Sequence, residues 1–202
     1  VIVLGAREGR FSKSGETKSL VPFAASSIPL VTLGTFLLWF GWFGFNGFSQ
    51  LAMGTFDDVN AISKIAVNTH LAGAAGTVAA AVVTRLLGGK TDIVMMLNGA
   101  LAGLVAITAE PLTPSPVLAI VIGAIGSLIM YFGTKFLESK KIDDVVGAIP
   151  VHMFAGIFGT LVVPISNPDT NFGTQLTGVI AVCLFSFILS YITFRVLKQT
   201  IG

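Results

Sequence analysis

The sequence predicts an all-α polytopic membrane protein. Of its 202 residues, 53% are hydrophobic and only 11% are charged, whereas a soluble domain usually carries about 25% charged residues. The chain also contains 23 glycines, which suit helices that pack closely in lipid. Its net charge of +2 is far below the basic excess typical of nucleic-acid binding. The expected surroundings are therefore a lipid bilayer, and nucleic acid is not an expected partner.

Charged residues divide the chain into apolar stretches. A helix needs about 20 residues without uncompensated charge to cross the hydrocarbon core of a bilayer. The predicted spans are residues 28–49, 62–86, 92–109, 115–137, 144–164 and 173–196. Residues 1–27 are predicted to hold the end of a preceding helix and a cytoplasmic loop. Because the chain starts with Val rather than Met, we expect it to be a fragment without its N-terminal part.

The boundaries of the spans follow charges and prolines in chain order. The uncharged stretches are 19–56, 65–84, 93–109, 111–134, 145–168 and 170–194. Three prolines within 111–116 separate the third span from the fourth, and a turn at 164–169 separates the fifth from the sixth. Asp143 and Asp144 lie where the fifth span begins, and the positive end of a helix favours carboxylates there. Small residues at 72–76 and 99–103 predict close packing of the second and third helices.

The connections between spans have an unequal distribution of charge. Eleven of the twelve basic residues fall on one side of the predicted bundle: Arg7, Arg10, Lys13, Lys18, Arg85, Lys90, Lys135, Lys140, Lys141, Arg195 and Lys198. The other side carries Asp57, Asp58, Glu110 and Asp169, with Lys64 as its cation. Because cytoplasmic loops carry the excess of Lys and Arg, both ends of the chain are predicted to be cytoplasmic. An even number of crossings is required for this, and six satisfies it.

Two histidines are the ionisable groups that lie well inside the predicted spans. Such a group is costly in a membrane and is a functional candidate by default. His152 falls near the middle of the fifth span, where an imidazole could pass a proton or hold a polar molecule; a hydrogen-bonded packing role is the alternative. His70 is followed by small residues, and for it we favour the packing role.

The first span ends in a run of aromatic residues. A belt of aromatics at the membrane interface is the simpler interpretation. However, Trp42, Phe45 and Ser49 are three and four residues apart, which places them on one helix face. Aromatic rings followed by a hydroxyl could receive a cation by cation–π attraction. No nucleophile–base pair, metal-ligand cluster or glycine-rich phosphate loop stands out, so neither an enzyme, a metal site nor a cofactor is predicted.

Four blocks of sequence together resemble the ammonium transporter (Amt/Mep/Rh) family. They are Trp39 to Asn46, Asn68-Thr69, Asn98 to Thr108, and Asp143-Asp144 with Gly147 to Thr160. The resemblance implies a fold of eleven transmembrane helices, two inverted five-helix halves plus a last helix, assembled as a homotrimer. Residues 28–202 then resemble helices 6–11, the C-terminal half of such a transporter in the cell membrane.

The resemblance also implies roles for five residues of this chain. His152 matches one of two facing pore histidines that mediate ammonium deprotonation and proton relay. Trp42 matches a pore-lining tryptophan, Phe45 one of two gating phenylalanines, Ser49 the hydroxyl of the outer recruitment site, and Thr108 a threonine near the pore. Two departures are Phe48 before Ser49 and Glu110 after Thr108-Ala109, where the family usually has a small and an uncharged residue.

The expected activity is passage of ammonium or ammonia through a hydrophobic pore past His152. One alternative is an ammonium sensor of the same family, and a second is an inert truncated fragment, because the residues of the family's first half are absent here. Family members often meet a small trimeric signalling protein at the cytoplasmic face. In this chain that contact would involve residues 135–144 and the C-terminus.

Overall fold

The computed structural model describes residues 1–11 and 23–201, and these residues form helices and turns without a strand. The helices are α1 (Ile28–Phe48), α2 (Phe56–Gly88), α3 (Ile93–Thr108), α4 (Pro116–Ser139) and α6 (Phe172–Thr200). Between α4 and α6 lies a continuous rod of η1 (Ile149–Phe154), α5 (Ala155–Val162) and η2 (Val163–Ile165). The predicted all-α fold class is confirmed. Lys13 and Lys18, two cations of the predicted cytoplasmic loop, lie outside the described residues.

The helices overlap the six predicted ranges, and the two largest differences are at the start of α2 and at the start of the fifth rod. α2 begins at Phe56, earlier than 62, because Thr55 and Asp58 form a capping box that satisfies free amides of the first turn. The fifth rod begins at Ile149 rather than 144, since Asp144 accepts hydrogen bonds from the amides of Ala148 and Ile149. The expected end of a preceding helix falls on residues 1–11, which form turns.

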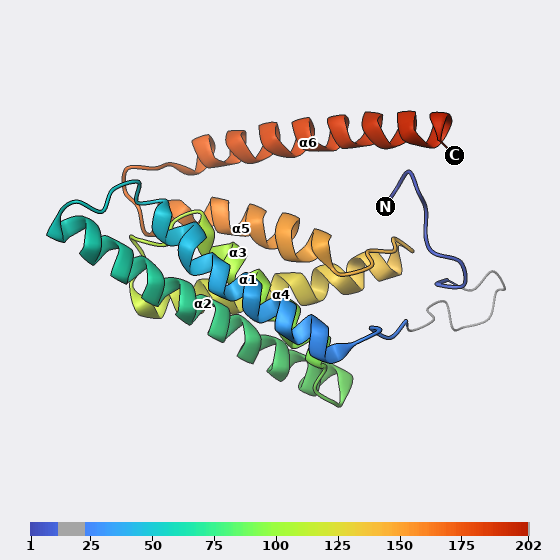
Figure 1. Cartoon of the computed structure of the whole chain (residues 1–202), viewed down its shortest axis with the longest axis horizontal. Helices are drawn as coiled ribbons and strands as arrows, with labels where there is room; N and C mark the ends of the chain where they lie inside the picture. The colour runs from blue at the N-terminus through green and yellow to red at the C-terminus, as the bar shows by residue number, and fades with distance from the viewer. Residues whose placement is uncertain (12–22, 202) are drawn as a thin grey trace.

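Four of the helices, α1, α2, α4 and α6, are long and apolar enough to cross a membrane. Two shorter apolar helices, Ile93–Thr108 and Ile149–Ile165, lie among them. α1, α3 and the α5 rod finish at one end of the bundle, and α2, α4 and α6 finish at the other (Figure 1). We call these the acidic end, which carries Asp57, Asp58, Glu110 and Asp169, and the basic end.

The core lies where α2, α3 and α4 meet, and small residues make this contact close. A Cβ added to Gly76 would strike the carbonyl oxygen of Gly99 on α3, and one added to Gly123 on α4 would strike the backbone of Ala72. Ser127 of α4 donates a buried hydrogen bond of 2.7 Å to the carbonyl of Gly76. The predicted role of the small residues in close helix packing is thus confirmed.

Helix α6 lies apart from this core. It runs alongside the α5 rod (Figure 1), and none of its residues is buried. Its last turn is tied to the start of the chain by a hydrogen bond of 2.9 Å from Lys198 Nζ to the carbonyl of Val3. The two ends of the chain therefore meet at the basic end.

An ion pair fixes the start of the chain to the base of the α5 rod. Arg7 donates from Nε and Nη2 to the two carboxylate oxygens of Asp143, both at 2.8 Å. These hydrogen bonds from Arg7 lower the pKa of Asp143 to about 2, against the opposing effect of desolvation. Arg10 adds a contact of 3.3 Å to Glu138 near the end of α4. Basic residues before α1 thus bind acidic residues beside the α5 rod.

Candidate functional site

A pocket of about 360 Å³ lies between α1, α3 and the α5 rod. It is lined by Trp42, Phe45, Val105, Thr108, Ala109, His152, Gly156 and Thr160. Four of the five residues selected from the sequence therefore line one pocket, although they are up to 110 positions apart along the chain. We call it the His152 pocket. Its walls are largely apolar, with one polar group on α1 and on α3, Trp42 and Thr108, and two on the α5 rod, His152 and Thr160.

The indole of Trp42 is held by a hydrogen bond across the pocket. Its Nε1–H donates to Thr108 Oγ1 at 2.7 Å, and the same hydroxyl donates to the carbonyl of Leu104 at 2.7 Å. The ring of Phe45 lies 6.0 Å from that of Trp42, at an angle of 57°. Because Thr108 has one hydroxyl proton, its bond to Leu104 leaves the oxygen free to accept from Trp42. The orientation of the indole is thereby fixed.

His152 lies in the π-helical turn η1 rather than in a regular α-helix. Pro150 has no amide proton, and the amide of Ala155 reaches back to the carbonyl of Pro150, five residues away. Such turns are rare and occur often at functional sites. Asp144 closes the first turn of the rod through the amides of Ala148 and Ile149, at 3.1 and 2.7 Å. His152 thus lies on a widened helical turn whose first amides are held by Asp144.

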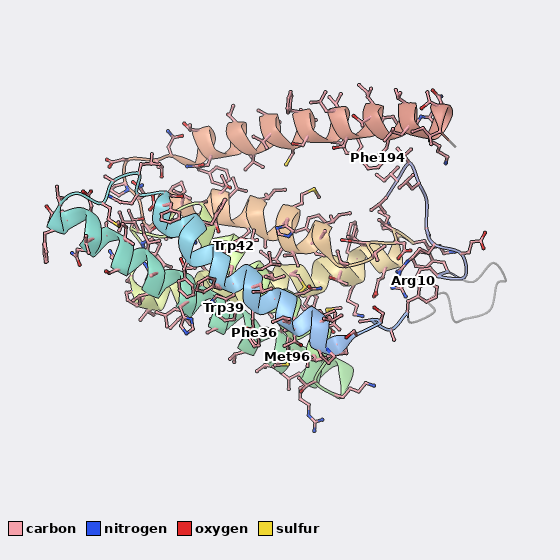
Figure 2. All side chains as sticks on the ribbon, in the orientation of Figure 1. Arg10, Phe36, Trp39, Trp42, Met96 and Phe194 are labelled. Atoms are coloured by element: carbon pink, nitrogen blue, oxygen red, sulfur yellow. The ribbon has the colours of Figure 1, made fainter. Side chains whose placement is uncertain are left out.

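Ser49 and His70 lie outside the residues that line the pocket. Ser49 caps the end of α1, is exposed, and donates its hydroxyl to the carbonyl of Phe45 at 3.0 Å. The ring of His70 on α2 lies 5.5 Å from Trp39 and 6.2 Å from Phe43. Figure 2 labels the two tryptophans of α1, Trp39 and Trp42. Trp39 lies against Gly73 of α2, whereas Trp42 contacts Thr108 of α3.

Sequence reasoning missed four residues that line the pocket: Val105, Ala109, Gly156 and Thr160. A helical repeat from His152 would have found Gly156 and Thr160, which follow at intervals of four. Val105 likewise precedes Ala109 by four. Their small or apolar side chains gave no chemical reason to select them.

Buried polar side chains hold the elements that line the pocket against α2. Asn46, on α1, donates a buried hydrogen bond of 3.0 Å to Thr69 of α2. Asn68 donates to the carbonyls of Pro111 and Pro114, each at 2.9 Å, and so holds the α3–α4 connection against α2. These bonds fix α1 and the end of α3, the two elements that carry Trp42 and Thr108. All three asparagine and threonine positions belong to the blocks selected from the sequence.

The pocket is open to the molecular surface. Phe45 is 64% exposed, and His152 is also exposed. Apolar and ionisable groups both face outward here, which a water-soluble surface or lipid alone would disfavour. The described residues contain no group of three or more His, Cys, Asp or Glu side chains able to hold a metal ion.

The fold and the pocket define an all-helical polytopic membrane protein with a mostly apolar pocket that carries isolated polar groups. The chain matches the model of the Ammonium Transporter Family over residues 1–202, and it therefore belongs to this family. It is 40% identical over 177 residues to ammonium transporter Amt2 of Archaeoglobus fulgidus, covering 88% of this chain and 36% of that protein. A putative ammonium transporter of Synechocystis is 38% identical, with 98% of this chain and 37% of that protein covered.

Solved structures show the same fold. A sensor Amt protein superposes with a TM-score of 0.87 at 34% identity, covering 98% of this chain and 50% of that one. Mep2 of Candida albicans superposes with a TM-score of 0.80 at 26% identity, covering 89% of this chain and 43% of that one. The chain thus spans about half the length, or less, of the relatives it matches.

Proposed function

We propose that this chain forms one wall of a pathway that carries ammonium or ammonia across a membrane. The observation that carries the proposal is the convergence of Trp42, Phe45, Thr108 and His152 on one pocket. All four match pore residues in the family resemblance, and Trp42, Phe45 and His152 were also candidates from their spacing and chemistry. Family membership and the names of the relatives support the same substrate.

Selectivity in such a pocket follows from the chemistry of the ion. Ammonium and K⁺ have the same charge, but ammonium can release a proton whereas K⁺ cannot. An apolar passage opposes any ion strongly and a neutral molecule weakly. In the proposed mechanism ammonium reaches a recruitment site that includes Ser49, passes Phe45 and loses its proton. His152 then escorts the neutral species, and the proton is relayed separately.

Because the pocket is open on one side, the proposed pathway needs a second wall. The exposed rings of Phe45 and His152 require a second wall to enclose a path. We assign that wall to a further part of the full-length protein, with a second pore histidine opposite His152, in a homotrimer of one pathway per subunit. The basic end faces the cytoplasm, because eleven of the chain's twelve basic residues are predicted to lie there. A small trimeric signalling protein would meet this end, at 135–144 and the C-terminus.

The test is an electrical recording from liposomes that contain the full-length protein. We expect ammonium pulses to evoke a current and K⁺ pulses of the same size to evoke none. The 202-residue chain alone should evoke neither, because its pocket is open on one side. Equal currents for ammonium and K⁺, or no ammonium current from the full-length protein, would overturn the proposal.

A sensor is the second candidate function, favoured by the likeness to a solved sensor Amt protein at 34% identity. In that case the pocket binds ammonium and reports it, with little transport. The sequence that follows Gly202 in the gene separates the two functions. A kinase or cyclase domain there would favour the sensor, and a short polar tail would favour the transporter.

A further inference from the structure

We propose that Glu110 supplies the fixed negative charge that raises cation affinity at the acidic end of the His152 pocket. The inference rests on the proposed function and adds to it a residue that sets the concentration of monovalent cation at the entrance. Glu110 directly follows Ala109, a lining residue of the pocket.

Hydrogen bonds place the carboxylate between α3 and the α5 rod. Oε1 accepts from the amides of Leu112 and Thr113 at 3.3 and 3.2 Å, and Oε2 accepts from Asn167 Nδ2 at 2.8 Å. The α5 side of the pocket runs from His152 through Gly156 to Thr160, and Asn167 follows two turns further along. The Glu110–Asn167 bond therefore links the end of α3 to the end of the α5 rod, just beyond the lining residues Ala109 and Thr160.

The charge at this point is not cancelled by a neighbouring cation. None of the ion pairs formed by the described residues involves Glu110. Its three donors are neutral amides, which orient a carboxylate without removing its charge. Glutamine at this position has one acceptor oxygen and could not accept all three bonds. Glu110→Gln therefore changes a hydrogen bond as well as the charge, and a control variant must separate the two effects.

The C-terminal ends of the neighbouring helices add to the negative potential of the Glu110 carboxylate. All three elements that line the pocket, α1, α3 and the α5 rod, end at the acidic end. The C-terminus of a helix carries about half a negative charge. A carboxylate at the end of α3 is therefore in an unfavourable field, and a cation that arrives at this end of the pocket relieves it. The arrangement favours a monovalent cation at the entrance, before the apolar part of the pocket.

The test compares ammonium-evoked currents in liposomes containing the full-length protein, as wild type and as Glu110→Gln. At an ionic strength of roughly 10 mM, where screening is weak, we expect the half-saturating ammonium concentration to rise about three- to tenfold. The maximal current should stay unchanged. In roughly 1 M choline chloride the two proteins should converge, because charges are screened within about 3 Å.

Two control variants separate charge from structure. Asn167→Ala removes the Glu110–Asn167 hydrogen bond but keeps the charge. Asp57→Asn removes a charge from the same end on α2, whose residues do not line the pocket. Both should leave half-saturation within about twofold of wild type at low salt. The inference is overturned if Asn167→Ala reproduces the Glu110→Gln shift, or if Glu110→Gln leaves half-saturation unchanged while wild type conducts. A wild-type protein without an ammonium current would instead overturn the proposed function, and this inference with it.

Discussion

At the scale of single residues, the contact between Trp42 and Thr108 is the most specific feature of the pocket. This pair could not have been recognised from the sequence, because 66 positions separate the two residues. The aromatic spacing on α1 predicted which face Trp42 occupies. The partner of its N–H became visible only once α3 was placed beside α1.

Replacement of Thr108 by Val tests this contact. The variant keeps the shape of the side chain but leaves the Trp42 N–H without its acceptor, which costs roughly 1–3 kcal/mol when the group is buried. We expect a lower thermal unfolding midpoint and slower methylammonium uptake by the full-length protein. Thr108→Ser keeps the hydroxyl and should behave close to wild type. Equal uptake by the Val and Ser variants would argue against a role for the hydrogen bond.

At the scale of the elements, small residues decide how closely α2, α3 and α4 approach. Their recurrence in the second and third spans predicted close packing, and the contacts of Gly76 and Gly123 confirm it. The π-helical turn around His152 was not predicted. Pro150 and the hydrogen bond from Ile149 to Asp144 lie at its start, but a proline in a span is also compatible with a simple kink.

Gly76→Ala tests the helix contact. Its Cβ would meet the backbone of α3 at Gly99, and overpacking of this kind typically costs about 1–3 kcal/mol. Gly34→Ala is a matched control, because nothing lies within 4 Å of its added Cβ. The unfolding midpoint in detergent should fall for the first variant and stay near wild type for the second. A similar midpoint for both variants would show that α2 and α3 can move apart without a loss of stability.

The Arg7–Asp143 ion pair predicts a pH dependence. The pKa of Asp143 is lowered to about 2 in the folded chain, below the value of about 3.9 for a free aspartate. The pair therefore stabilises the fold fully above pH ~4, and its contribution disappears as pH falls towards about 2. Asp143→Asn removes the titrating group, so the difference in unfolding midpoint between wild type and variant should shrink over this interval. A difference that stays constant down to pH 2 would show that the pair does not stabilise the native state.

At the scale of the whole molecule, the sequence predicted the fold class and the number of helices from charge spacing alone. Spacing and chemistry selected Trp42, Phe45 and His152, the family resemblance added Thr108, and all four line one pocket. The small lining residues and the Glu110–Asn167 bond depend on tertiary packing, and no local pattern indicates them. Ser49 was selected for its place on the Trp42–Phe45 face, yet it caps the helix end outside the pocket lining.

The central claim is that His152 acts on the transported species, and the second histidine of the chain offers a direct control. His152 lines the pocket, whereas His70 lies between Trp39 and Phe43 away from it. The decisive measurement is the ammonium-evoked current of the full-length protein carrying His152→Ala or His70→Ala. A positioned proton-transfer group typically contributes about 10²–10⁴-fold, so His152→Ala should lower the current at least tenfold and His70→Ala should not. An unchanged rate, selectivity and current in His152→Ala would contradict the account.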